Sequence, residues 1–193
     1  MNWTLIFNPF SKISSKTLML VGVVTFLLGC FVSWHFKMIY DGILDVHTYP
    51  KITYLRAFAS NAMNVIVLCT SLFILAKIIN PSAKMIDILN TSFLYRLPIY
   101  FIAALSNVPI LKEVQDKVTE NLSSLPNLQL STTEMVTTIL FNLISLLLLA
   151  YSIVIIVSGF KQAAHPKKWQ HFLSLGVAIV VAEVVSKIFI SQM

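Results

Sequence analysis

The sequence predicts an all-α polytopic membrane protein, a bundle of five transmembrane helices with an interfacial amphipathic helix between spans 3 and 4. Three observations predict this class. Of 193 residues, 57% are hydrophobic and only 11% are charged, whereas soluble domains carry about 25% charged residues. The mean hydropathy is +0.82. The hydrophobic residues form five long runs with the charges mostly between them, so we expect a single membrane domain over residues 1–193.

Each hydrophobic run is long enough to cross a bilayer, because about 20 helical residues span its hydrocarbon core. The first run is also longer than the hydrophobic part of a signal peptide, and no small-x-small cleavage site follows it. It therefore predicts a retained span. The expected spans are about 17–36, 57–76, 88–108, 135–160 and 172–190.

The connection between the third and fourth spans predicts an amphipathic helix. Its apolar residues recur at helical spacing, and charged residues mostly occupy the rest of the helix surface. Such a helix rests on the bundle or on the lipid surface. Further along, Ser131 and Glu134 form a capping box at the start of the fourth span. The apolar positions are Ile110, Leu111, Val114, Val118 and Leu122.

Aromatic and apolar residues also precede the first span. Aromatic side chains are typical of the headgroup region of a membrane. The segment predicts either a stretch that lies on the membrane surface or an ordered lead-in to the first span. The residues are Trp3, Leu5, Ile6, Phe7, Phe10 and Ile13.

The distribution of cations predicts the orientation. The N-terminal side carries seven lysines, and the opposite side carries five Lys or Arg residues. Cytoplasmic loops have an excess of such residues, so we expect the N-terminus in the cytoplasm and the C-terminus outside. The net charge of +6 lies in these short segments and predicts topology, not nucleic-acid binding. The seven are Lys12, Lys16, Lys77, Lys84, Lys161, Lys167 and Lys168.

Charged residues inside the spans are the first candidates for function, because each is costly in lipid. Arg96 and Glu183 lie roughly 12 Å and 17 Å into their helices at 1.5 Å per residue, so a pair across helices is allowed. Lys187, one turn after Glu183, could pair with it instead or reach outward. A structural clamp, a substrate or ion pathway, and a shallower fifth span with hydrated charges all fit. Pro98 predicts a kink beside Arg96.

Milder polar residues add candidates within the spans. Asp87 and Asn90 lie at the start of the third span. Polar residues also form one stripe on the second span and one on the fourth. Both stripes predict helix packing, in a monomeric bundle or a homo-oligomer, with a polar conduit as the alternative. The stripe residues are Asn61, Asn64, Ser71, Asn142, Ser145 and Ser152.

The sequence contains no pattern of catalytic, metal or cofactor chemistry. The four histidines have no metal-ligand spacing, and neither a nucleophile elbow nor a glycine-rich phosphate loop is present. Cys30 and Cys69 lie inside apolar runs and predict neither a disulfide nor a zinc site. For Asp41, Asp45 and His47 we expect a solvated turn at Asp41-Gly42, with a weak divalent-ion contact as the alternative. We therefore expect no catalytic residues, no metal, no cofactor and no enzyme.

Several short motifs occur in order along the chain. They are Asn8-Pro9-Phe10, then Ile86-Asp87-Ile88-Leu89-Asn90 leading to Arg96-Leu97-Pro98, then Tyr151, Gly159-Phe160-Lys161 and Ala163. With these motifs the whole chain resembles the YIP family of Ypt/Rab-interacting-protein-like five-span membrane proteins, in its short bacterial form.

The resemblance to the YIP family implies a five-helix bundle with a cytoplasmic N-terminus, here in a bacterial inner membrane. Eukaryotic members act in vesicle trafficking and contact small GTPases through a cytosolic N-terminal region. Only about sixteen residues precede the first span here, and the acidic-Leu-Tyr-Gly-Pro motif is missing, so GTPase binding is not expected. We expect a non-enzymatic protein that organises or scaffolds membrane or protein partners. The alternative is a small transporter or channel using Arg96, Glu183 and Lys187.

Overall fold

The computed structural model describes residues 6–120 and 129–193, and within them five helical segments are long and apolar enough to cross a membrane. They confirm the five predicted spans and make the chain an integral membrane protein. The spans are α2 (Ser15–His35), α3 (Tyr54–Ile79), the consecutive α4 (Met85–Leu94) and α5 (Leu97–Leu105), α7 (Thr132–Ala164) and α8 (Trp169–Ser191).

Polar caps set where three of the spans begin. The side chain of Ser14 accepts a hydrogen bond from the backbone of α2, and Thr53 does the same for α3. Ser131 and Glu134 form the predicted capping box of α7. Such caps satisfy N–H groups that have no partner within a helix, which matters most in a protein surrounded by lipid.

The third span is two helices rather than one. α4 ends and α5 begins at Tyr95 and Arg96, just before Pro98. Proline has no N–H to donate and its ring clashes with the preceding turn of a helix. The predicted kink is thus confirmed, and Arg96 lies at the break between the two helices.

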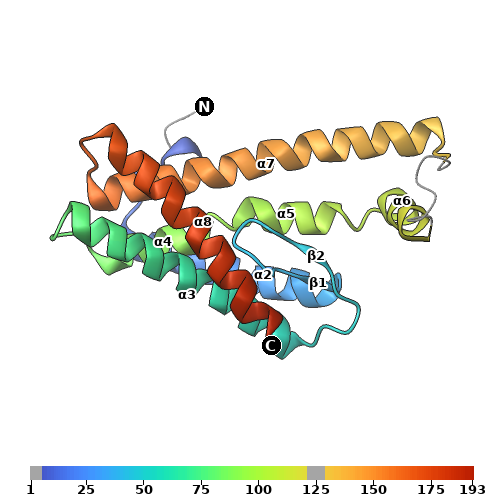
Figure 1. Cartoon of the computed structure of the whole chain (residues 1–193), viewed down its shortest axis with the longest axis horizontal. Coiled ribbons are helices and arrows are strands. Elements are labelled where there is room, and N and C mark those ends of the chain that lie inside the picture. Colours follow the sequence, from blue (N-terminus) through green and yellow to red (C-terminus); the bar gives the residue numbers. More distant parts are fainter. Residues whose placement is uncertain (1–5, 121–128) are drawn as a thin grey trace.

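The helices form one bundle (Figure 1). α2 packs on α3, α4 and α5, while α7 packs on α4 and α5 from another side. α8 packs mainly along α3. The main hydrophobic cluster joins residues from α2, α3, α4, α5, α7 and α8, including Leu68, Ile88 and Ile156.

The predicted amphipathic helix is α6 (Pro109–Glu120). Figure 1 shows it end-on beside the start of α7, so it runs across the bundle and not along it. Val114 is its buried residue, and Lys117 pairs with Glu134 of α7. The helix thus rests on the bundle, one of the two positions expected from the sequence. Leu122 lies outside the described residues.

The described part of the N-terminal segment is an ordered lead-in. The 3-10 helix η1 (Pro9–Ser11) buries Phe10. The hydroxyl of Tyr151 on α7 donates a 2.8 Å hydrogen bond to the carbonyl of Ile6, and Phe7 meets the Tyr151 ring edge to face. Trp3 and Leu5 lie outside the described residues.

Candidate functional site

The connection between α2 and α3, residues 36–53, turns back into the bundle. Its two short strands, β1 (Met38–Ile39) and β2 (His47–Thr48), form an antiparallel hairpin whose tip lies alongside α5 (Figure 1). Tyr40 and Ile43 in the tip are fully buried. The Tyr40 carbonyl bonds to Asn64, ten residues into α3 and thus roughly 15 Å along it at 1.5 Å per residue. We call residues 36–53 the re-entrant loop.

Side chains from four parts of the bundle bind the backbone of the re-entrant loop. Irregular backbone at membrane depth is tolerated only where protein or water satisfies its polar groups. The bonds are Ser33 Oγ to the Met38 carbonyl at 2.6 Å, Asn64 Nδ2 to the Tyr40 carbonyl at 2.7 Å, Arg96 Nη2 to the Gly42 carbonyl at 3.4 Å, and the Leu44 N–H to Glu183 Oε2 at 3.0 Å.

Arg96 lies at the break of the third span and is fully buried. Its guanidinium carbon is 4.8 Å from the ring centre of Tyr40, 5.7 Å from that of Tyr95 and 5.9 Å from that of Tyr100. Aromatic faces attract a cation by their quadrupole, most strongly when it is desolvated. The three rings therefore replace part of the hydration that Arg96 loses.

Glu183 and Lys187 meet the opposite flank of the re-entrant loop. Lys187 Nζ is 3.3 Å from Glu183 Oε1 and 2.7 Å from Asp45 Oδ2. The Lys187 hydrogen bond lowers the pKa of the Asp45 carboxyl below its ordinary range, while partial burial opposes that shift. Lys187 thus ties α8 to the loop.

The direct Arg96–Glu183 pair that the sequence allowed is not formed. Among the described residues the ion pair of Glu183 is with Lys187, the second of the two pairings considered. Arg96 and Glu183 instead bind the same short stretch of backbone, at Gly42 and Leu44. The third and fifth spans are therefore joined through the re-entrant loop.

Gly42 is buried, which corrects the expected solvated turn at Asp41-Gly42. A Cβ built on Gly42 would overlap the Glu183 carboxylate. Only glycine lets that carboxylate approach the backbone so closely. Asp41 and His47 come within 3.3 Å of each other, but no cluster of three or more metal-ligating side chains occurs in the described ranges.

Asp87 and Asn90 of α4 lie away from the re-entrant loop and contact the start of α2. Ser15 Oγ donates to Asp87 Oδ1 at 2.8 Å, and Asn90 Nδ2 donates to the Ser15 carbonyl at 3.0 Å. The two residues therefore dock the first turn of α2 on α4. They do not belong to the same site as Arg96.

The two predicted polar stripes differ in the structure. On α3, Asn64 binds the re-entrant loop, and Asn61 donates to the Phe26 carbonyl and accepts from the Tyr100 hydroxyl. Ser71 is half-buried. On α7, Ser152 is buried, Ser145 is half-buried and Asn142 is exposed. The α3 stripe lies inside the bundle. The α7 stripe is buried at Ser152, in the second half of the helix, and is exposed at Asn142, in the first half.

Sequence reasoning missed the re-entrant loop and the tyrosines around Arg96. The signal was present in the loop composition. A connection that lies in water rarely contains so many apolar residues, and their share predicts burial. The apolar residues are Met38, Ile39, Tyr40, Ile43, Leu44 and Val46.

Neither a protein-family model, nor a curated protein, nor a solved structure matches the chain. Its own geometry therefore defines the class: a five-span membrane protein whose first connection re-enters the bundle. The motifs of the YIP resemblance lie at packing positions. A Cβ on Gly159 would overlap Thr91 of α4, and Tyr151 binds the segment that leads to Phe10. The resemblance itself stays a prediction.

Proposed function

We propose that this chain is a non-enzymatic, YIP-like membrane protein that organises or scaffolds membrane or protein partners. The proposal rests on one observation. α7 has 33 residues, and only 17% of its most apolar stretch is buried within the chain, yet this helix carries Asn142 in an exposed position. Asn142 lines a groove between α7, α5 and the re-entrant loop, where its exposed amide can hydrogen-bond with a helix of a partner.

The polar residues inside the bundle support the same proposal. Arg96 and Glu183 are used to bind the re-entrant loop, and Asn61 and Asn64 pack α3 against its neighbours. Residues engaged in this way stabilise one arrangement of helices. α7 is then the helix with the most unburied surface to offer a partner.

We place the protein in a bacterial inner membrane with the N-terminus cytoplasmic and the C-terminus outside. The support is the lysine excess on the N-terminal side and the YIP resemblance. To test this orientation, a single cysteine replaces Lys84 or Lys51, and its labelling by a membrane-impermeant thiol reagent is measured in intact cells. Labelling at position 84 and not at 51 would reverse the orientation.

The experiment for scaffolding measures self-association through α7. Single cysteines replace Leu147 on α7 or Val180 on α8, both strongly exposed, in a chain whose Cys30 and Cys69 are alanine. We expect disulfide cross-links between copies in liposomes at position 147 and not at 180, and fewer cross-links with Asn142→Leu. Equal cross-linking at both positions, or none with Asn142 intact, would count against the α7 interface.

A second candidate, a small transporter or channel, is favoured by the Asp45–Lys187–Glu183 ion pairs, because Lys187 and Asp45 are partly exposed to one side of the bundle. Solute or ion flux into proteoliposomes distinguishes the two. Flux that Glu183→Gln abolishes, with the purified variant still folded, would favour transport over scaffolding.

A further inference from the structure

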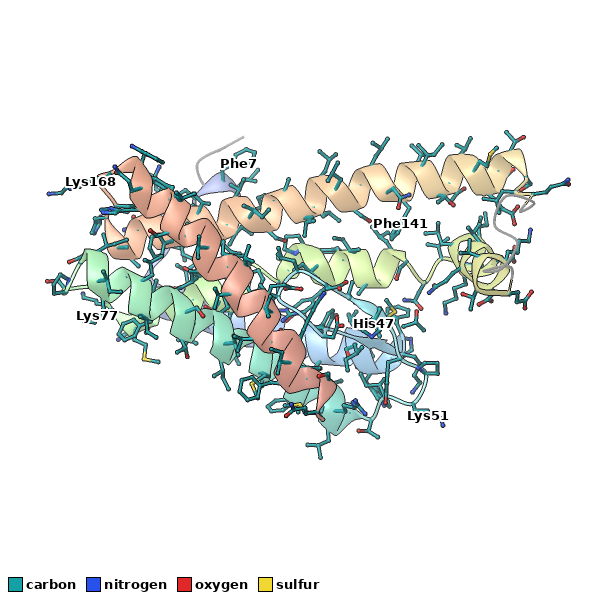
Figure 2. The ribbon with its side chains drawn as sticks, in the orientation of Figure 1. Phe7, His47, Lys51, Lys77, Phe141 and Lys168 are labelled. Carbon is teal, nitrogen blue, oxygen red and sulfur yellow. The ribbon has the colours of Figure 1, made fainter. Side chains whose placement is uncertain are left out.

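A cationic cavity lies at the end of the bundle where α3 and α7 finish and α8 begins. Its volume is about 530 Å³, and four of the residues that line it are Lys or His: His165, Lys167, Lys168 and His171. The described lining contains no Asp or Glu. Figure 2 places Lys168 and Lys77 at this same end, far from Lys51.

Two turns build this cavity and are joined to each other. Asn80, which ends α3, donates from Nδ2 to the Ala163 carbonyl of α7, and its own Oδ1 accepts from the Ser82 N–H. His165 ends α7 in the left-handed conformation, with φ of 47°. The left-handed residue turns the chain sharply, so that Lys167 and Lys168 follow directly beside Asn80 and Pro81.

The polar groups in the cavity are suited to an anion. Nδ1 of His171 is shielded from solvent and has no hydrogen-bond partner in the described part of the chain. Lys168 is the N-cap of α8 but makes no side-chain cap bond. The His171 N–H bonds to the Lys168 carbonyl, which leaves the N–H groups of Trp169 and Gln170 available. The positive end of the helix dipole also favours negative charge there.

The position of the cavity selects the source of that anion. Trp169, 71% exposed, stands next to Lys168, and exposed tryptophans are typical of the headgroup region. Basic pockets between transmembrane helices are suited to anionic lipid headgroups. We infer that this cavity, between the α3–α4 turn and the α7–α8 turn, binds the phosphate of an anionic phospholipid. The inference does not depend on the proposed function.

Trp169 provides the test. In a Trp3→Phe/Trp34→Phe chain it is the single tryptophan, and acyl-brominated phosphatidylglycerol quenches its fluorescence when bound nearby. In mixed nanodiscs with phosphatidylcholine, we expect Trp169 to be quenched more by brominated phosphatidylglycerol than by brominated phosphatidylcholine at equal fractions. Lys167→Gln/Lys168→Gln should lower the relative binding constant by roughly fivefold per lysine.

Matched variants keep the result interpretable. Lys12→Gln/Lys16→Gln removes the same charge at the same end of the bundle but outside the cavity, and should leave the preference unchanged. Lys167→Arg/Lys168→Arg should retain it, which separates charge from folding. Equal losses in both glutamine variants, or no preference in the starting chain, would overturn the inference.

Soluble competitors distinguish other anions from lipid. Millimolar glycerol phosphate should not displace the brominated lipid, because it has no acyl chains to stay in the membrane. Displacement by glycerol phosphate would assign the cavity to a free phosphate compound. Displacement by polyglutamate alone would assign it to an acidic protein segment. Either result would overturn the lipid assignment.

Discussion

The third span and α7 differ most among the five spans in how deeply they are buried. Of its most apolar stretch, 61% is buried within the chain in the third span and 17% in α7. The third span is the least apolar of the five and α7 the most apolar. In a soluble protein the most apolar helix lies inside. Here apolar surface can face lipid, and the most buried span is the one that carries Arg96, Tyr95 and Asn90.

The comparison shows where stability and partner binding are located. The third span contacts α2, α7 and the re-entrant loop, so changes in it disturb several elements at once. α7 has one packed side and one side of exposed Leu, Ile and Val residues. Changes on that exposed side should leave the fold of the single chain intact.

The largest expected difference is between Arg96→Ala and Leu147→Ala. Arg96→Ala empties a fully buried site and leaves the Gly42 carbonyl without its donor, so we expect a loss of about 3–5 kcal/mol in unfolding free energy. Leu147 is 71% exposed, and its truncation should change that free energy by less than about 0.5 kcal/mol. Reversible unfolding in mixed micelles measures both. Similar losses at the two sites would break the comparison.

Glycine substitutions should give the next largest effect. A Cβ on Gly29 of α2 would overlap the Tyr100 ring of α5, whereas a Cβ on Gly176 of α8 meets nothing within 4 Å. We expect Gly29→Ala to lower the unfolding free energy by about 1–3 kcal/mol through overpacking. Gly176→Ala should raise it by up to about 1 kcal/mol, because alanine favours helix. Thermal denaturation in detergent compares them, and a stable Gly29→Ala variant would show that α2 and α5 can separate.

The two asparagines of the polar stripes should differ by a smaller amount. Asn64 donates to the Tyr40 and Ser60 carbonyls, so Asn64→Ala should cost about 0.6–1.7 kcal/mol, the range of such bonds in membranes. Asn142→Ala should cost close to nothing in a monomeric detergent preparation. The unfolding free energies of the two variants decide this. A costly Asn142→Ala would mean that α7 has an internal polar partner.

The smallest effect concerns the edge of the buried region, where Asp45 meets Lys187. The pKa of Asp45 is lowered in the folded chain, so its ionised form contributes stability that is complete above the ordinary value of about 4. That contribution disappears as the pH falls below about 4 and through the lowered pKa. It should amount to less than about 1 kcal/mol, because the pair is partly exposed. Comparing native and Asp45→Asn chains across this acidic range measures it, and a difference that persists in acid would assign the effect to packing.

The sequence predicted the spans well and the connections less well. Runs of apolar residues fix which segments cross a membrane, because the hydrocarbon thickness sets their length. The α4–α5 break was also readable, from Pro98. The apolar composition of the re-entrant loop indicated that it is buried, but its depth was not readable, since that depends on donors and acceptors far away in the chain, such as Asn64 and Glu183.

The candidate site shows the same limit. Arg96, Glu183 and Lys187 were identifiable because charge is rare in a span. Their partners were not, because a charge in the sequence does not say whether another charge, a carbonyl or an aromatic ring faces it. Arg96 contacts three aromatic rings and donates to a backbone carbonyl, and Glu183 accepts from a backbone N–H.

The bond between Leu44 and Glu183 joins residues 139 positions apart. During synthesis, α2, the re-entrant loop and α3 are therefore made long before their last partner exists. The loop can bind Asn64 first, then Arg96 once the third span follows, and Glu183 only when α8 has entered the membrane. The order of the chain thus makes the insertion of α8 the step that completes the interior.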